Sequence, residues 1–280
     1  RHLRHSRDAL RGLEGSVLKG NEHVDHILSI CTGIGGLDLG FSGGLRSIGR
    51  TPRTVCYLER EAFPCACLAK AIEGGWMDDA PLWLGDIKGL PLGDLPRIDW
   101  IIGGYPCQPY SASGRRRGKQ DERHLWPAIM QLVRKFRPSG MLFENVAGHI
   151  TLGLLDVLSD LEKGGYRTAW GLFSAEEVGA PHGRERVFIL ALADTDSERG
   201  RLRNPEREDA EDARKSPVGA WPSRPGEPGK LWEAFRTTQP GLGRATHGLP
   251  DRVDRLRALG NAVVPQTAER AFTQLWRELQ

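Results

Sequence analysis

The chain has 280 residues, of which 39% are hydrophobic and 27% are charged. This composition is ordinary for a soluble globular protein. No segment approaches the roughly 18 consecutive apolar residues of a membrane span, so we expect no membrane partner. The formal net charge of +3 is only mildly basic and does not by itself indicate a nucleic-acid partner.

The N-terminal residues and the cysteine count exclude two further classes. We expect residues 1–23 to be a polar tail or an initial helix. The first twenty residues are basic and lack the apolar run of a secretory signal, so we expect a cytoplasmic protein. An odd number of cysteines in a non-secreted chain argues against a disulfide framework. Cys65 and Cys67 lack a second Cys/His pair at zinc-ligand spacing, so we expect no metal site. The cysteines are Cys31, Cys56, Cys65, Cys67 and Cys107.

From Val24 the chain alternates between strand and helix patterns. Strands are predicted at 26–31, 54–58, 98–102, 141–143, 167–173 and 186–192. Helices are predicted at 125–136, 154–163 and 265–279. The alternation predicts an α/β fold with a mostly parallel sheet covered on both faces. Ligands of such sheets bind beyond the carboxyl ends of the strands.

The composition changes after Leu192. Residues 193–257 are rich in Pro, Gly, Arg, Asp and Glu, with few apolar residues, which predicts either a small, irregular accessory domain or a partly disordered insert. Helical periodicity then returns. We therefore expect four parts: a tail at 1–23, a main domain at 24–192, the small region at 193–257, and a C-terminal helix within 258–280 that completes the main domain.

A glycine-rich turn, Cys31-Thr32-Gly33-Ile34-Gly35-Gly36, follows the first predicted strand. Glycines at a strand-to-helix turn let the backbone approach a ligand closely and direct helix amides at it. The spacing differs from the G-x-G-x-x-G of dinucleotide sites, which disfavours hydride transfer. Taken alone, the turn could equally have a purely structural role instead of binding a ligand.

Two carboxylates follow apolar runs further along the chain. Glu59 ends the second predicted strand, where a carboxylate can accept hydrogen bonds from both ribose hydroxyls. Asp86 follows an apolar stretch and is suited to an adenine amino group. The alternatives are a surface glutamate and a turn aspartate.

The segment GGYPCQPYSASGRRRGKQDERHLW (103–126) places Cys107 after Pro106, just beyond a predicted strand. A thiolate at such a place is a competent carbon nucleophile where positive charge lowers the thiol pKa. The basic residues that follow, which can hold DNA phosphates, are Arg115, Arg116, Arg117 and Lys119. The alternative is an inert buried cysteine beside a solvated run of charge.

Three further positions lie near predicted element ends. Glu144, at the end of a buried strand near a nucleophile, can have a raised pKa and donate a proton, or it can belong to a helix-capping pair. Arg184 and Arg186 point to one face if both lie in a strand, where they form either a stabilising pair or a surface ion-pair stripe. Asn261 precedes a proline-initiated helix and either starts it or closes a pocket.

Taken in order, these segments resemble the DNA (cytosine-5)-methyltransferase family, in its compact phage or bacterial form. The resemblance covers about residues 26–192 and 256–280. It is most specific at Pro106-Cys107-Gln108 and Glu144-Asn145-Val146. It implies a Rossmann-like sheet that binds S-adenosylmethionine, with a small irregular target-recognition region at 193–257. It also implies a monomer that acts on double-stranded DNA in the cytoplasm of a bacterial or phage-infected cell.

The resemblance assigns roles residue by residue. Cys107 matches the nucleophile that attacks C6 of a flipped-out cytosine, Glu144 the residue that holds N3 and the amino group, and Arg186 the arginine on the base carbonyl, with Arg184 supporting it. The implied cofactor residues are Gly33, Ile34, Gly35, Gly36, Glu59, Asp86 and Asn261. The implied DNA contacts are Gln108, Ser111, Ser113, Arg115, Arg116, Arg117 and Lys119.

This sequence departs from the family at several positions. Cys31 stands where the family commonly has an aromatic residue, and residues 193–257 are short and polar for a target-recognition region. Two other interpretations stay open: a DNA-binding homologue without transfer activity, and the same chemistry on RNA or with a modified sulfonium donor. The complete set of Cys107, Glu144, Arg184 and Arg186 argues against the first.

Overall fold

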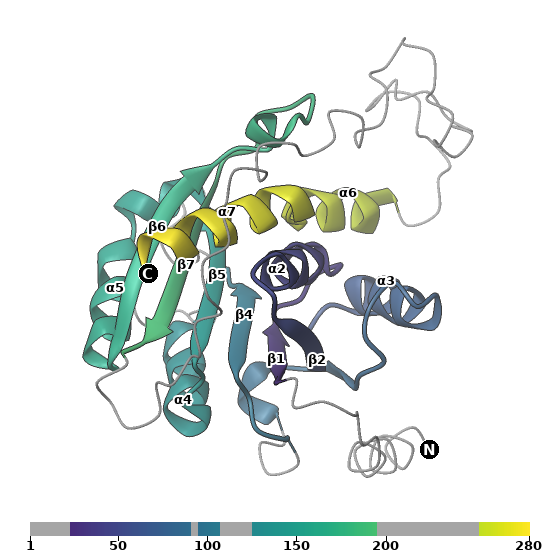
Figure 1. Cartoon of the computed structure of the whole chain (residues 1–280). Helices are drawn as coiled ribbons and strands as arrows, with labels where there is room; N and C mark the ends of the chain where they lie inside the picture. Colours follow the sequence, from purple (N-terminus) through teal and green to yellow (C-terminus); the bar gives the residue numbers. More distant parts are fainter. Residues whose placement is uncertain (1–22, 91–94, 107–124, 195–251) are drawn as a thin grey trace.

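The computed structural model describes residues 23–90, 95–106, 125–194 and 252–280 (Figure 1). Seven strands form one sheet in the order β3-β2-β1-β4-β5-β7-β6. The strands are β1 (Val24–Ile30), β2 (Thr51–Glu59), β3 (Leu82–Leu84), β4 (Trp100–Gly104), β5 (Gly140–Val146), β6 (Tyr166–Phe173) and β7 (Arg186–Ala193). β1 to β5 pair in parallel, whereas β7 runs antiparallel to both β5 and β6. The predicted α/β fold with a mostly parallel sheet is confirmed.

The helices have recognisable sequence boundaries. α4 has a proline in its first turn and α7 begins at Pro265, because proline fits the start of a helix. α5 ends before Gly164. The helices are α2 (Gly36–Ser47), α3 (Ala62–Glu73), α4 (Trp126–Phe136), α5 (Leu154–Lys163), α6 (Arg252–Asn261) and α7 (Pro265–Glu278). The short 3₁₀ helices are η2 (Ile87–Gly89), η4 (Ala147–Thr151) and η5 (Glu176–Val178). α6 spans the boundary that the composition suggested between residues 257 and 258.

The sheet separates two hydrophobic clusters, one on each face. On one face, α2 and α7 pack together on strands β1, β4, β5, β6 and β7. On the other face, α4 and α5 cover the same central strands. β4 and β5 are buried along almost their whole length, as expected for strands covered on both sides. Figure 1 shows that the C-terminal helix α7 returns to lie beside α2, although the two are far apart in sequence.

Three glycines of α2 allow the C-terminal segment to approach closely. A Cβ atom on Gly36 would lie 2.1 Å from the Val263 carbonyl oxygen, and one on Gly40 would lie 2.1 Å from the Pro265 carbonyl oxygen. A Cβ on Gly44 would meet the ring of Phe272 at 2.5 Å. The spacing of four residues places the three glycines on one side of the helix. The C-terminal segment is therefore in close contact with the helix that follows the glycine turn.

Replacing Gly40 with alanine is expected to destabilise the fold by about 1–3 kcal/mol, because the backbone of the C-terminal segment would have to move. Chemical denaturation of the variant and of Gly148→Ala measures this effect. A Cβ on Gly148 meets no atom within 4 Å, so the control is expected to unfold like the parent. Equal stability of the Gly40 and Gly148 variants would contradict this packing.

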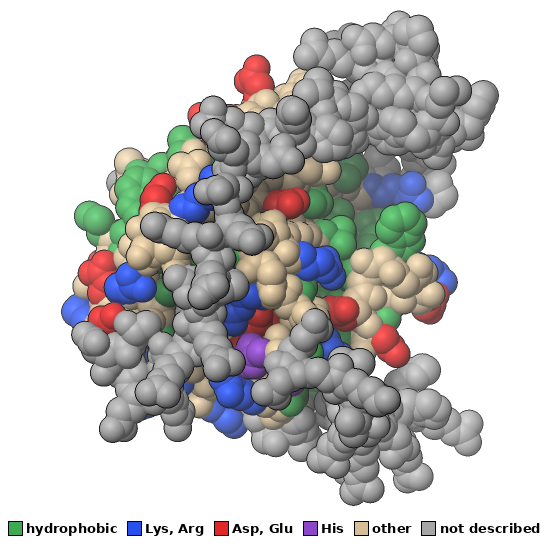
Figure 2. Space-filling view, in the orientation of Figure 1, with side chains coloured by type: hydrophobic (Ala, Val, Ile, Leu, Met, Phe, Trp, Pro, Cys, Tyr) green, Lys and Arg blue, Asp and Glu red, His purple; other side chains and the backbone are tan. Residues whose placement is uncertain are grey.

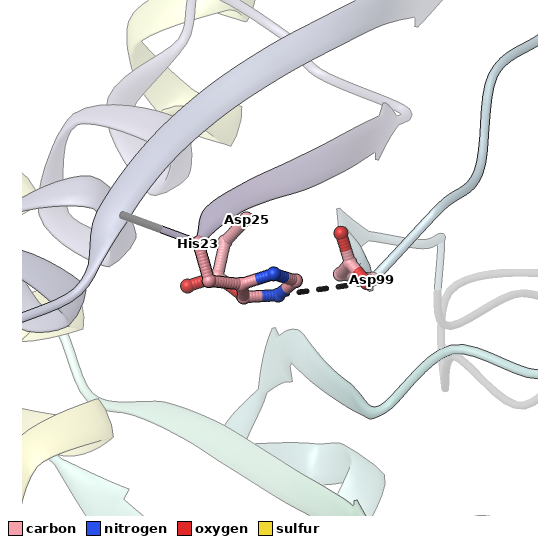
Figure 3. A group of neighbouring side chains, drawn as sticks. All are labelled: His23, Asp25 and Asp99. Atoms are coloured by element: carbon pink, nitrogen blue, oxygen red, sulfur yellow. Dashed lines mark ion pairs between the residues drawn. The ribbon is translucent and has the colours of Figure 1, made fainter. Parts of the chain in front are cut away.

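Two buried carboxylates with charged partners lie at the amino ends of β1 and β4, opposite the carboxyl ends of these parallel strands. Figure 3 shows His23 beside Asp25 and Asp99. Asp25 also accepts hydrogen bonds from Arg50 and from the indole of Trp100. Arg97 pairs with Asp99 at 2.9 Å. Because two arginines already neutralise the two carboxylates, a divalent cation here would leave excess positive charge, and we interpret the group as structural.

Within the described residues, no helix has the length and apolarity needed to cross a membrane. Acidic and basic side chains are scattered over the described part of the face drawn in Figure 2.

Candidate active site

One cavity of about 630 Å³ opens at the carboxyl ends of the central strands. Its size lies within the range that small-molecule and cofactor sites occupy. The chain leaves β1 for a helix on one face of the sheet and leaves β4 for a helix on the other, which opens a crevice between these neighbouring strands. The predicted site residues that line the cavity are Gly33, Ile34, Gly36, Glu59, Asp86, Glu144, Arg186 and Asn261.

Several predicted residues do not line this cavity or lie outside the described residues. Gly35 is buried at the start of α2, where a Cβ would meet Met77 at 2.6 Å. Arg184 lies beside the C-terminal segment, as described below. Pro106, which directly precedes Cys107, lines the cavity. The predictions that lie outside the described residues concern Cys107, Gln108, Ser111, Ser113, Arg115, Arg116, Arg117 and Lys119, the N-terminal tail and most of the small region.

The glycine turn has the conformation that only glycine adopts without strain. Gly33 and Gly35 have φ of +60° and +86°, in the left-handed region. A Cβ on Gly33 would meet no atom within 4 Å, so the backbone there is open to a ligand. No side chain caps the N-terminus of α2, and Gly36 and Leu37 in its first turn line the cavity. The turn therefore presents backbone amides, which suit a carboxylate group.

Glu59 connects the turn to the second strand. Its Oε2 accepts a hydrogen bond from the Gly33 amide at 2.8 Å, and its Oε1 accepts from the amides of Arg60 and Glu61 at 2.7 and 2.8 Å. The side chain is buried but lines the cavity. Each carboxylate oxygen has two lone pairs, so Oε2 can still accept from a ligand hydroxyl. The sequence predicted the ligand-facing position of Glu59, but not its role in holding the turn.

Asp86 and Asn261 both line the cavity and come from segments far apart in the sequence. Asp86 is exposed, and its Oδ1 accepts from the Lys88 amide at 2.9 Å, which caps η2. Asp86 therefore has the turn role that was predicted as one alternative. It also lines the cavity, as the other alternative requires, and its contact with an adenine stays a prediction. Asn261 ends α6 and lines the cavity together with Ala262 and Val263.

Asp38, in the first turn of α2, was not predicted as a site residue. It is 3% exposed, and neither of its carboxylate oxygens has a hydrogen-bond partner among the described residues. Burial raises its pKa to about 7. Above about pH 7, where its ionised form predominates, this carboxylate adds negative charge beside the glycine turn. A cationic cofactor suits such a site electrostatically.

Replacing Asp38 with asparagine is expected to stabilise the protein by about 2 kcal/mol at pH 8, because a buried unpaired charge is removed. The folded-state pKa lies above the usual value of 3.8, so the folded protein binds more protons than the unfolded chain between about pH 4 and 7. The parent therefore loses stability as pH rises through this interval, and the advantage of the variant should shrink at pH 5. Denaturation at both pH values measures the difference. A variant less stable than the parent at pH 8 would contradict this interpretation.

Glu144 and Arg186 form an ion pair at the other end of the cavity. The Arg186 Nε lies 2.9 Å from Glu144 Oε1, and both side chains are largely buried. A Cβ on Gly104 would lie 2.8 Å from Glu144 Oε2, so glycine on the neighbouring strand leaves room for the carboxylate. Burial raises the Glu144 pKa to about 7, although Arg186 and Arg184 act in the opposite direction. Near neutral pH this carboxyl can therefore donate or accept a proton.

Asn145 and Tyr105 fix the backbone that leads to Pro106. The Asn145 Nδ2 donates to the Tyr105 carbonyl oxygen at 3.0 Å. The Tyr105 hydroxyl is hydrogen-bonded to His149 Nε2 at 2.8 Å, and burial lowers the pKa of His149 to about 4, so its ring is neutral near pH 7. Asn145 thus connects the Glu144 strand to the segment before Cys107. The sequence signal for Asn145 was its place in Glu144-Asn145-Val146, but nothing in the sequence indicated that it would bind the Tyr105 carbonyl oxygen.

Arg184 does not share a strand face with Arg186, and that expectation was wrong. β7 begins at Arg186, and Arg184 precedes it with φ of 45°. Its Nη2 donates to the Gly260 carbonyl oxygen at 2.8 Å and to the Ala262 carbonyl oxygen. Strand periodicity could not predict this contact because the residue lies in a left-handed turn.

Comparisons with known proteins agree with this geometry. The family model described as C-5 cytosine-specific DNA methylase matches residues 26–229. Among curated relatives, the type II methyltransferase M.NgoBV of Neisseria gonorrhoeae is 28% identical over 174 residues, which cover 58% of this chain and 40% of that protein. M.BanI of Aneurinibacillus aneurinilyticus is 31% identical over 170 residues, which cover 59% of this chain and 38% of that protein.

A solved structure supports the fold. A DNMT2 variant of Spodoptera frugiperda superimposes with a TM-score of 0.50 at 18% identity, and the match covers 67% of this chain and 54% of that one. The match to the curated relatives spans about 40% of their length. The predicted Rossmann-like methyltransferase fold is confirmed. Because the family model covers well over half of the residues, the chain belongs to the C-5 cytosine-specific DNA methylase family.

Proposed function

We propose that the chain transfers a methyl group from S-adenosylmethionine to C5 of a flipped-out cytosine in double-stranded DNA. The observation that carries this proposal is the composition of one cavity. The glycine turn and Glu59 line one end, and Glu144 with Arg186 lines the other, next to the Pro106 that precedes Cys107. A cofactor and a base can therefore meet in a single space.

The residues at the first end fit the cofactor. The amides at the start of α2 suit the carboxylate of the cofactor. Glu59 suits the ribose hydroxyls, and Asp86 suits the adenine amino group. Asn261 also lines this cavity. The unpaired carboxylate of Asp38 favours a ligand that carries positive charge. When bound, the cofactor supplies an electrophilic methyl group on a sulfonium centre.

The residues at the second end suit a cytosine ring. We propose that the Cys107 thiolate adds to C6, which moves electron density to C5 and N3. Glu144 in its neutral form donates to N3, and Arg186 donates to the ring carbonyl oxygen, so the developing negative charge is offset. C5 then attacks the sulfonium methyl group, which releases S-adenosylhomocysteine as a neutral thioether. Loss of the C5 proton to a water molecule, breakage of the bond between sulfur and C6, and return of the N3 proton to Glu144 restore the aromatic base, the free thiolate and the neutral acid.

The burial of Glu144 supports the proposal that the base is extruded from the duplex. The Glu144 side chain is only 8% exposed, and it lines the cavity on β5, beside Gly104 of β4. A base stacked in a duplex cannot reach it, so the target nucleotide must rotate out of the helix. We propose that the basic residues from Arg115 to Lys119 bind the phosphates beside the extruded nucleotide.

Transfer of a labelled methyl group tests the proposal. The protein is incubated with methyl-labelled S-adenosylmethionine and either duplex DNA or RNA, and the nucleosides are then separated by mass spectrometry. The expected product is 5-methyldeoxycytidine from DNA. Label in RNA alone, in the exocyclic amino group, or in neither nucleic acid despite cofactor binding would contradict the proposal.

A further inference from the structure

Arg184 bridges two segments of the cavity that are far apart in sequence. It lies two residues before Arg186, which pairs with Glu144 in the proposed base site. Its guanidinium reaches the carbonyl oxygens of Gly260 and Ala262. Residues 260–263 line the cofactor end of the cavity. One side chain therefore links the base end of the cavity to the segment that borders its cofactor end.

The contact suits a cation for two reasons. Gly260 is the penultimate residue of α6, and the last carbonyl groups of a helix lack partners within the helix and carry partial negative charge. The guanidinium also offers several N–H groups in a fixed plane, so it can reach two carbonyl groups at once. A lysine could make only part of this contact.

The backbone supports the same interpretation. Arg184 has φ of 45°, in the left-handed region, where a residue with a Cβ atom is strained. The two hydrogen bonds to the C-terminal segment compensate for that strain. On the other side of the segment, the Val263 carbonyl oxygen is in close contact with Gly36 of the glycine turn. Residues 260–263 are thus held between Arg184 and the turn.

We propose that Arg184 is a positioning residue that fixes residues 260–263 against the glycine turn and so sets the affinity for the cofactor. The inference rests on the proposed function of this cavity, because the ligand is S-adenosylmethionine. Arg184 acts through the segment that it holds, and Arg186 acts on the base. The two neighbouring arginines therefore have separable effects.

Calorimetric binding of S-adenosylhomocysteine by Arg184→Met, Arg184→Lys and the matched control Arg186→Lys tests the inference. Arg184→Met is expected to raise the Kd about 10- to 100-fold, as for loss of a hydrogen bond to a charged group, and Arg184→Lys less. Arg186→Lys should leave the Kd within about twofold. In steady-state assays, Arg184→Met should raise the KM for S-adenosylmethionine more than it lowers kcat. Arg186→Lys should lower kcat more than it raises this KM.

Hydrogen exchange of the ligand-free proteins separates this inference from the proposed function. Amides of residues 260–264 should exchange faster in both Arg184 variants than in the parent, whereas the β-sheet amides should not change, which would show that the fold is intact. An unchanged Kd with a fall in kcat like that of Arg186→Lys would overturn the inference, and so would unchanged exchange. If the parent binds the cofactor but methylates no nucleic acid, the proposed function fails while the Arg184 result still stands.

Discussion

Replacing Cys107 with serine is expected to reduce methyl transfer by a factor of about 10⁴ or more, because the hydroxyl is far less nucleophilic than a thiolate. Without addition at C6, C5 of cytosine does not become electron-rich enough to attack the methyl group. The loss should therefore appear in kcat at saturating DNA and cofactor. Incorporation of labelled methyl groups into DNA measures it.

Two controls make the Cys107 result specific. Binding of S-adenosylhomocysteine should be unchanged, because the predicted cofactor residues lie on other segments. Cys67→Ser, a partly buried thiol on α3, should retain full activity. C5 methylation by the Cys107 variant at a rate near that of the parent would exclude Cys107 as the nucleophile.

Replacing Glu144 with glutamine is expected to lower kcat by a factor of about 10² to 10³, within the range for loss of a positioned general acid. Glutamine keeps a hydrogen-bond donor near N3 but cannot transfer a proton. It also leaves Arg186 without its carboxylate partner, which lies 2.9 Å away in the parent. Glu176→Gln, an exposed substitution in η5, is the matched control and should be neutral.

The pH profile identifies the protonation state in which Glu144 acts. Its pKa is raised to about 7, so the neutral acid predominates below that pH and the carboxylate above it. If the neutral form acts as the donor, its contribution declines as pH rises through about 7. The profile of kcat/KM for DNA should show this decline in the parent and lack it in Glu144→Gln. The same decline in both proteins would contradict the assigned role.

The strands and their ends could be predicted from sequence because buried apolar runs are local signals. The runs ending near Ile30, Glu59 and Ile102 became β1, β2 and β4, and the rule that ligands bind beyond strand ends then located the site. β3 has only three residues and was not predicted. The reversed direction of β7 was not predictable either, since hydrophobic periodicity carries no information on strand direction.

The contacts that assemble the site depend on pairs of residues distant in sequence. Asn145 binds the Tyr105 carbonyl and Arg184 binds the Gly260 carbonyl, and a backbone acceptor leaves no mark on residue type. Asp38 resembles an ordinary acidic residue in the first turn of a helix until packing buries it. The glycines of α2 have the appropriate spacing, but their partner is a helix more than 200 residues later. Contacts of this kind cannot be predicted from local sequence patterns and become visible only in the folded structure.

Covalent capture tests the central claim most directly. DNA with 5-fluorocytosine in place of cytosine retains the methyl-accepting carbon but blocks loss of the C5 substituent, so the bond between sulfur and C6 persists. The proposal predicts a denaturant-resistant complex that forms only with S-adenosylmethionine, is absent in Cys107→Ser, and yields a nucleotide-bearing peptide that contains Cys107. A protein that methylates ordinary DNA at C5 but forms no such complex, or forms it through another residue, would contradict the role of Cys107.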